Sequence, residues 1–402
     1  MSNAVGGIPR YRAFGGPALF QAGFRPFFLG AALWASVGIG LWYLVFTGRR
    51  ELATGFDPLA WHMHEMLFGF AAAAVAGFML TAIPNWTGRL PLQGAPLVVL
   101  VLLWAGGRAA MLVSATIGPV AAALIDGAFL AALLLAVARE IAAGRNWRNL
   151  PMVGALALLL IANACMHLEA IGLADTARLG MRLGLAVLLM LIALVGGRII
   201  PSFTRNWLAK QGQQPSLPPG IGTFDRLALA TAGLGLAAWV AALPPTMTGA
   251  LLLAAGLLAA GRLARWRGHL TLAEPLLLVL HVGHGWLAAG LTLLGASQLW
   301  PAIPPSAALH ALTVGAVGTM TLAVMTRATL GHTGRPLTAG AGTVAIYALV
   351  TLAALARIGA AVAGTAYLPL LGAASVCWIA AFGGFLVLYG PILLAPHEKG
   401  TG

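Results

Sequence analysis

Long apolar runs separated by short polar connections are the feature that most restricts how this chain can fold. The runs from Phe27 to Phe46, Leu97 to Val113 and Leu124 to Val137 approach or meet the length of about 20 residues that a membrane-spanning helix needs. Only 8% of the 402 residues are charged, whereas a soluble globular domain carries about a quarter. We therefore expect an all-α polytopic membrane protein.

Segmentation by hydropathy predicts about twelve membrane-spanning helices. Their expected starts lie near Phe27, Pro58, Ala95, Gly118, Leu150, Ala177, Thr223, Met247, Leu272, Pro305, Gly340 and Tyr367.

The basic residues gather after the even-numbered spans. They are Arg89, Arg139, Arg145, Arg148, Arg205, Lys210, Arg262, Arg265, Arg267 and Arg335. Because positively charged loops stay on the cytoplasmic side, this pattern places both termini in the cytoplasm. It also accounts for the net charge of +13, so that we expect the lipid bilayer, and not nucleic acid, as the partner.

An internal repeat organises the chain. The steps from His64 to the TGR that ends at Arg89 equal those from His310 to the TGR that ends at Arg335. A related segment, IIPSFTRNW, lies between them, and Met181 falls where the other copies have histidine. We interpret this as three four-helix units of about 20–145, 146–268 and 269–396, as internal repeats in membrane proteins allow. The alternative is chance recurrence of Pro and Gly at helix ends.

Two histidines and a glutamate begin the second predicted span. Asp57 followed by Pro58 is a helix-start signal, so that His62, His64 and Glu65 should be helical. Residues two apart point about 200° away from each other, so the two histidines should not share one metal. We favour His64 as a ligand of a buried metal or haem because the repeat matches it to His310, and leave His62 to a neighbouring site or a hydrogen bond. Glu65 is three residues after His62 and would orient it.

His281 and His284 lie on one face of the ninth predicted span, near mid-membrane. Paired imidazoles suit copper or iron, so we expect copper there. A third donor would come from His310, His62 or His167, and haem would need another ligand if His310 served copper. Hydrogen bonding between helices is the alternative role for these side chains.

Two arginines lie at matching places in the repeat. Arg108 and Arg357 sit in the outer part of their spans, near the expected level of His64 and His310. A guanidinium group binds a carboxylate in a bidentate manner, so both arginines are candidates for binding haem propionates. Snorkelling to the interface is the alternative.

Four segments resemble one family. They are GFRPFF (23–28), WHMHEMLFGF (61–70), GFMLTAIPNWTGR (77–89) and GGRIIPSFTRNW (196–207), and in this order they look like the NnrS family of bacterial inner-membrane proteins. The resemblance implies haem b and copper, a twelve-helix fold, and a role in nitric oxide metabolism and resistance to nitrosative stress. The chain has no CxxCH, so any haem would be held by side-chain ligands alone.

Three classes of function stay open at this point. The first is a haem- and copper-containing protein that binds nitric oxide or also reduces it, with Glu65 as proton donor, an unknown electron donor, and a plan similar to haem–copper oxidases. The second is a haem b protein that carries electrons or senses. The third is a membrane transporter, which the repeats alone favour.

Overall fold

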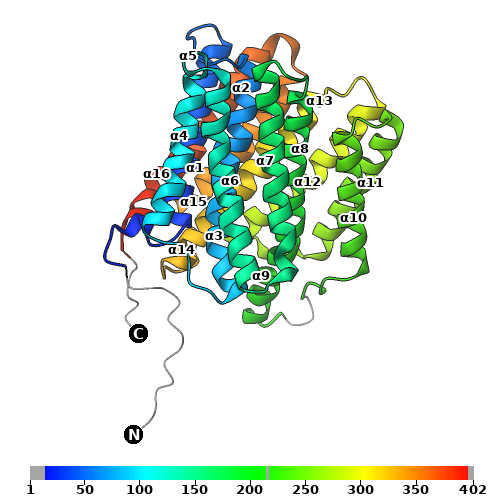
Figure 1. Ribbon diagram of the computed structural model, residues 1–402. Coiled ribbons are helices and arrows are strands. Elements are labelled where there is room, and N and C mark those ends of the chain that lie inside the picture. The colour runs from blue at the N-terminus through cyan, green and yellow to red at the C-terminus, as the bar shows by residue number, and fades with distance from the viewer. Residues whose placement is uncertain (1–13, 214–216, 397–402) are drawn as a thin grey trace.

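The computed structural model describes residues 14–213 and 217–396, and in this part of the chain every regular element is a helix (Figure 1). The elements are η1 (Ala18–Phe20), α1 (Phe24–Phe46), α2 (Pro58–His64), η2 (Glu65–Ala71), α3 (Ala72–Thr87), α4 (Ala95–Leu112), α5 (Ser114–Ile117), α6 (Pro119–Ala143), η3 (Trp147–Asn149), α7 (Leu150–Ile171), α8 (Ala177–Leu191), η4 (Ile192–Gly196), α9 (Gly197–Lys210), α10 (Thr223–Val240), α11 (Pro245–Arg265), η6 (Gly268–Thr271), α12 (Pro275–Leu299), α13 (Pro305–His310), η7 (Ala311–Gly318), α14 (Thr319–His332), α15 (Ala341–Ala360), η8 (Gly364–Ala366) and α16 (Tyr367–Leu394).

Eleven helices in the described residues are long and apolar enough to cross a membrane. Five of them combine several elements: α2 with η2 and α3, η3 with α7, α8 with η4 and α9, α13 with η7 and α14, and η8 with α16. The seventh predicted span is α10, which has 18 residues but is not among the eleven. Asp225 and Arg226 in its first turn lower its hydropathy. The expected all-α polytopic membrane fold is confirmed.

The start of α2 follows from its sequence. Asp57 accepts hydrogen bonds from the backbone N–H groups of Leu59, at 2.9 Å, and Ala60, at 3.0 Å. Pro58 occupies the first turn, where no helical N–H bond is lost. The predicted helix start is therefore confirmed, and it fixes the position of His62 and His64.

Three segments, η2, η4 and η7, are π-helical. Such segments are rare and are frequently found at functional sites. Two of them begin at the residue after His64 and at the residue after His310, which are the two positions that the repeat matches. The division of the chain into three units stays a prediction.

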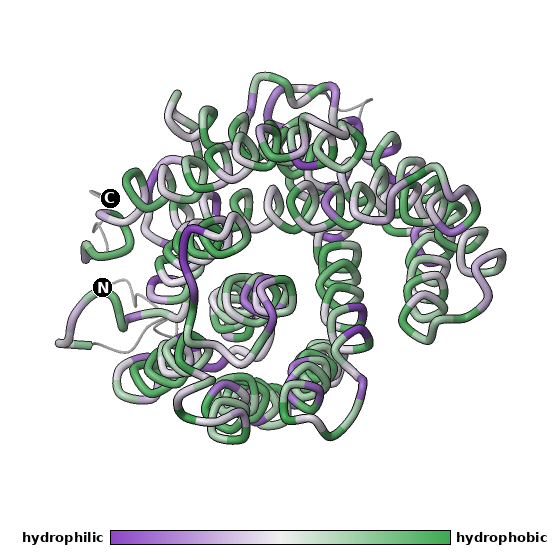
Figure 2. Tube along the Cα trace, turned by 90° about the horizontal axis from the view of Figure 1, so that it is seen from above, coloured by the Kyte–Doolittle hydropathy of each residue, from purple (hydrophilic) through white to green (hydrophobic). Residues whose placement is uncertain are grey.

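The span Pro58–Thr87 is the most buried of the eleven, with 72% of its apolar window inside the protein. In the view along the helices, other helices surround a central one, and the hydrophobic colour follows most of the helical trace (Figure 2). The pair α10 and α11 lies at one edge of the bundle and packs on α12 (Figure 1). The deepest positions for polar side chains therefore lie on and around α2 and η2.

Candidate functional site

Helix α2 presents its two histidines to different surroundings. His62 lines a cavity between α1, α2, α8, α13, α15 and α16. His64, two residues later, is completely buried, hydrogen bonds to side chains from η2 and α7, and lies 3.2 Å from Asp126 on α6. This separation agrees with the angle of about 200° expected between them.

A charged network surrounds His64. Its Nδ1 atom is 2.9 Å from Oε1 of Glu65. Arg108, from α4, donates to both carboxylate oxygens of Glu65 at 2.6 Å. The other terminal nitrogen of Arg108 donates to Oδ1 of Asp126, on α6. The sequence predictions included His64, Glu65 and Arg108 but missed Asp126.

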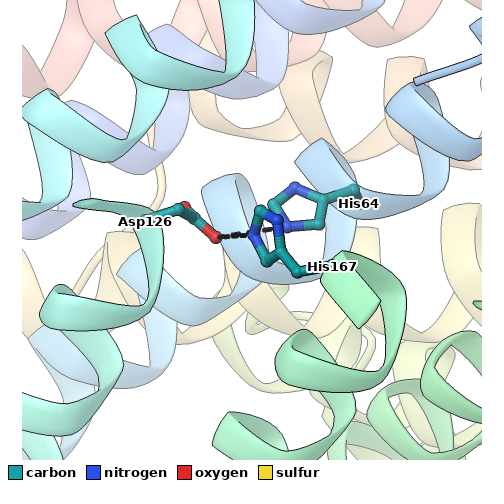
Figure 3. A group of neighbouring side chains, drawn as sticks. All are labelled: His64, Asp126 and His167. Atoms are coloured by element: carbon teal, nitrogen blue, oxygen red, sulfur yellow. Dashed lines mark hydrogen bonds and ion pairs between the residues drawn. The ribbon is translucent and has the colours of Figure 1, made fainter. Parts of the chain in front are cut away.

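Three side chains meet at the second carboxylate oxygen of Asp126. Oδ2 accepts a hydrogen bond from Nδ2 of Asn163 at 2.7 Å, and lies 3.0 Å from Nε2 of His167 and 3.2 Å from Nε2 of His64. Figure 3 shows the two imidazole rings turned toward this carboxylate. The ligating atoms of His64, Asp126 and His167 all lie within 4.8 Å of one another, a spacing that can hold a metal ion.

The network is closed off from solvent. Its members are at most 4% exposed: His64, Glu65, Arg108, Asp126, Asn163 and His167. The ring of Phe56 lies 5.5 Å from that of His64 and 5.6 Å from that of His167. Gly107 makes room for Asp126, because a Cβ atom at Gly107 would lie 2.9 Å from Oδ1. Burial makes each charge in the network depend on its partners.

The cavity beside α2 has a volume of about 380 Å³ and is mostly apolar. His62, His310, Arg357 and Met181 are among its lining residues. Met181 is the residue that the repeat aligns with histidine. A volume in this range suits a ligand of drug or cofactor size.

The polar groups that line the cavity have nitrogen atoms without hydrogen-bond partners. Nδ1 of His310 donates to the carbonyl oxygen of Ser306 at 2.6 Å, which leaves Nε2 with a lone pair. The ring of His62 stacks on Trp42 with 4.3 Å between centroids, and its buried Nδ1 has no hydrogen-bond partner. A buried guanidinium nitrogen of Arg357, Nη1, also has no partner.

The matched residues of the repeat therefore lie in different environments. His310 and Arg357 line the cavity, whereas His64 and Arg108 do not. Arg108 is bound to Glu65 and Asp126. The structure thus does not bring His64 and His310 together around this cavity, and it places His62 there.

His281 and His284 form a third group, on α12. Nε2 of His281 is 3.0 Å from Oγ1 of Thr204, and neither ring nitrogen of the buried His284 has a hydrogen-bond partner. In the described residues, no third His, Cys, Asp or Glu completes a metal-binding group with this pair. A sulfur atom lies against the same helix, because Sδ of Met320 would be 2.6 Å from a Cβ on Gly283, the residue before His284.

Arg262 lies on α11 beside this pair. Its Nε donates to Asp225 at 3.0 Å and its Nη1 to the backbone oxygen of Ala193 at 3.2 Å. Its guanidinium also lies 5.1 Å from the ring centroid of Trp266, which packs on His284. The ion pair joins α10 to α11, and the hydrogen bond to Ala193 joins α11 to the π-helical segment η4.

Comparison with known proteins identifies one family. A family model described as NnrS protein matches residues 18–397, nearly the whole chain. A search of curated proteins finds no match.

Proposed function

The chain belongs to the NnrS family, whose members are membrane proteins related to nitric oxide, and we propose that it binds nitric oxide at a haem b held in the cavity of His62 and His310. One observation carries the proposal. The cavity combines two imidazoles and a buried, partly unpartnered guanidinium with apolar walls. These features suit haem, because its iron takes imidazole ligands and its propionates are anionic.

The residues have distinct roles in this proposal. His310 is the primary iron ligand, since its hydrogen bond to Ser306 fixes the tautomer with Nε2 free. Arg357 would bind a propionate through Nη1. When bound, haem supplies an iron centre that takes nitric oxide as a ligand. Glu65 does not line the cavity, so we assign it the orientation of His64 instead of proton donation.

The second part of the proposal concerns a copper site at His281 and His284. His281 and His284 offer imidazole nitrogens without partners, and Met320 offers a thioether close to His284. Imidazole with a soft thioether is a donor set that suits Cu(I). We place the family's copper at this group, as the paired histidines predict, with Met320 as an added donor.

The cavity also favours a second candidate function. Because His62 and His310 line the same space, both imidazoles can ligate one haem and leave no position for nitric oxide. The protein would then carry electrons or act as a sensor, without turnover.

We further propose that the protein lies in the inner membrane with both termini in the cytoplasm. The basic connections support this orientation, because they follow the even-numbered spans. The cavity would then lie toward the outer side, where α2 and α13 begin. Its electron donor is unknown.

The test is haem content in detergent-purified protein, measured by the pyridine haemochrome assay. We expect His310→Ala to lose the haem spectrum and His64→Ala to retain it. His269→Ala is the matched control, because His269 is exposed. Loss of haem in His64→Ala with full retention in His310→Ala and His62→Ala would refute the cavity assignment.

Nitric oxide added to the reduced protein then separates the two candidate functions. A shift of the haem absorption bands supports an open position on the iron, whereas an unchanged spectrum supports the electron carrier or sensor. Metal analysis of the double variant of His281→Ala and His284→Ala tests the copper site. Copper content should fall to near zero while haem remains.

A further inference from the structure

The network around His64 contains two hydrogen-bond acceptors that face each other. An ionised Glu65 only accepts hydrogen bonds, so Nδ1 of His64 must donate to it. In the neutral ring, Nε2 of His64 then carries a lone pair. This atom lies 3.2 Å from Oδ2 of Asp126, which is also an acceptor. Asn163 bridges the two with one amide group, but the contact between them calls for a cation.

The charges of the buried side chains in the network also favour a cation there. Two carboxylates, Glu65 and Asp126, face one guanidinium, Arg108, and all three are buried. The sum is −2 + 1 = −1, before any charge on the histidines. An uncompensated charge at membrane depth is costly, so the network favours a cation: a divalent metal ion changes the sum from −1 to +1, and a proton on His64 changes it to 0.

The distances suit a metal ion. Nε2 of His64 and Nε2 of His167 lie 3.2 and 3.0 Å from Oδ2 of Asp126. Two metal–ligand bonds of about 2.1 Å at a right angle put their donor atoms about 3 Å apart. The three donors come from three helices, α2, α6 and α7, so the fold and not local sequence holds them together.

The surrounding contacts are those that orient metal ligands. Glu65 holds the ring of His64 through Nδ1, as a carboxylate does behind many metal-bound histidines. Arg108 fixes Asp126 through Oδ1 and leaves Oδ2 directed at the two imidazoles. Figure 3 shows this convergence.

We propose that His64, Asp126 and His167 bind a divalent first-row metal ion, separate from the haem cavity and from the copper group. Two imidazoles and one carboxylate, with further positions open, are the donor set of non-haem Fe(II). The site has no sulfur donor among these three ligands, which distinguishes it from the copper group near Met320. Fe(II) is therefore the ion that we assign, and the assignment does not depend on haem in the cavity.

The experiment uses the full-length protein in detergent, stripped with a chelator and then given Fe²⁺ alone or Co²⁺ alone. Iron is measured by mass spectrometry after subtraction of haem iron, and Co²⁺ by its visible absorption. We expect the wild-type protein to take up one equivalent, and Asp126→Asn and His167→Gln to take up none. Glu140→Gln and His269→Ala are the controls and should bind as the wild type does.

Glu65→Gln tests the orienting contact, with an expected loss of affinity of about 10–100-fold. X-ray absorption of the iron-loaded wild type gives a readout that does not depend on how variants fold. It should show nitrogen and oxygen neighbours near 2.1 Å and no sulfur. Failure of the wild type to bind either ion would overturn the proposal and indicate that a proton on His64 supplies the charge. Uptake unchanged in both ligand variants, or uptake of copper in place of iron, would also overturn it.

Discussion

Replacement of Gly197 by alanine should destabilise the protein by removing one buried ion pair. A Cβ atom at this position would overlap Nη2 of Arg262 and lie 2.9 Å from its Cζ. The guanidinium would have to leave, which breaks its bonds to Asp225 and to the backbone oxygen of Ala193. Breaking a buried pair so that one charge stays behind costs about 3–5 kcal/mol. Alanine in a helix regains about 0.5–1 kcal/mol relative to glycine, so we expect the free energy of unfolding to fall by about 2–4 kcal/mol.

The neighbouring glycine provides the control. A Cβ at Gly196 would meet nothing nearer than 3.5 Å, and alanine in a helix is favoured over glycine by about 0.5–1 kcal/mol. Gly196→Ala should therefore be neutral or slightly stabilising. Unfolding of both variants in mixtures of mild detergent and dodecyl sulfate measures the difference. Equal stabilities for Gly196→Ala and Gly197→Ala would refute the argument that Arg262 fixes this contact.

Three more outcomes are expected. Arg108→Met should lower the free energy of unfolding by about 3–5 kcal/mol in the same assay. Adding Glu65→Gln should recover part of this loss, because one of the two carboxylates left without Arg108 is then neutral. A double variant no more stable than Arg108→Met alone would contradict this. Thr204→Val should cost about 1–3 kcal/mol by leaving Nε2 of His281 without a partner, and Thr204→Ser should not, so equal effects would exclude the hydrogen bond. A fluorescent reporter fused to the C-terminus should be active only in the cytoplasm, and activity of a periplasmic reporter there would reverse the proposed orientation.

The helices could be predicted because the information about them is local. Long apolar runs marked the spans, and the pair of Asp57 and Pro58 marked the start of α2. The π-helical segments were not predicted. Hydropathy depends on the residue type and not on whether the helix is α or π. The apolar runs around η2 and η7 therefore did not indicate a π-helix.

The grouping of site residues was harder to predict, because it depends on how helices pack. Asp126 contacts His64 and His167, which lie 62 and 41 positions away. A signal was present, since Asp126 is an acidic residue inside an apolar run and such residues usually mark a functional site. The repeat drew attention to the region of His64 and His310, but sequence spacing does not tell which helix face meets which cavity.

Because α2 is short, binding in the cavity of His62 can affect binding in the network of His64. This helix has seven residues, between a capped start and a π-helical segment, and it carries both His62 and His64. A rotation of the helix that improves contacts on one side must alter those on the other. A ligand in the cavity and a cation in the network would then influence each other's affinity by the same factor, as reciprocity of binding equilibria requires. Occupancy of one place would set the strength of binding at the other.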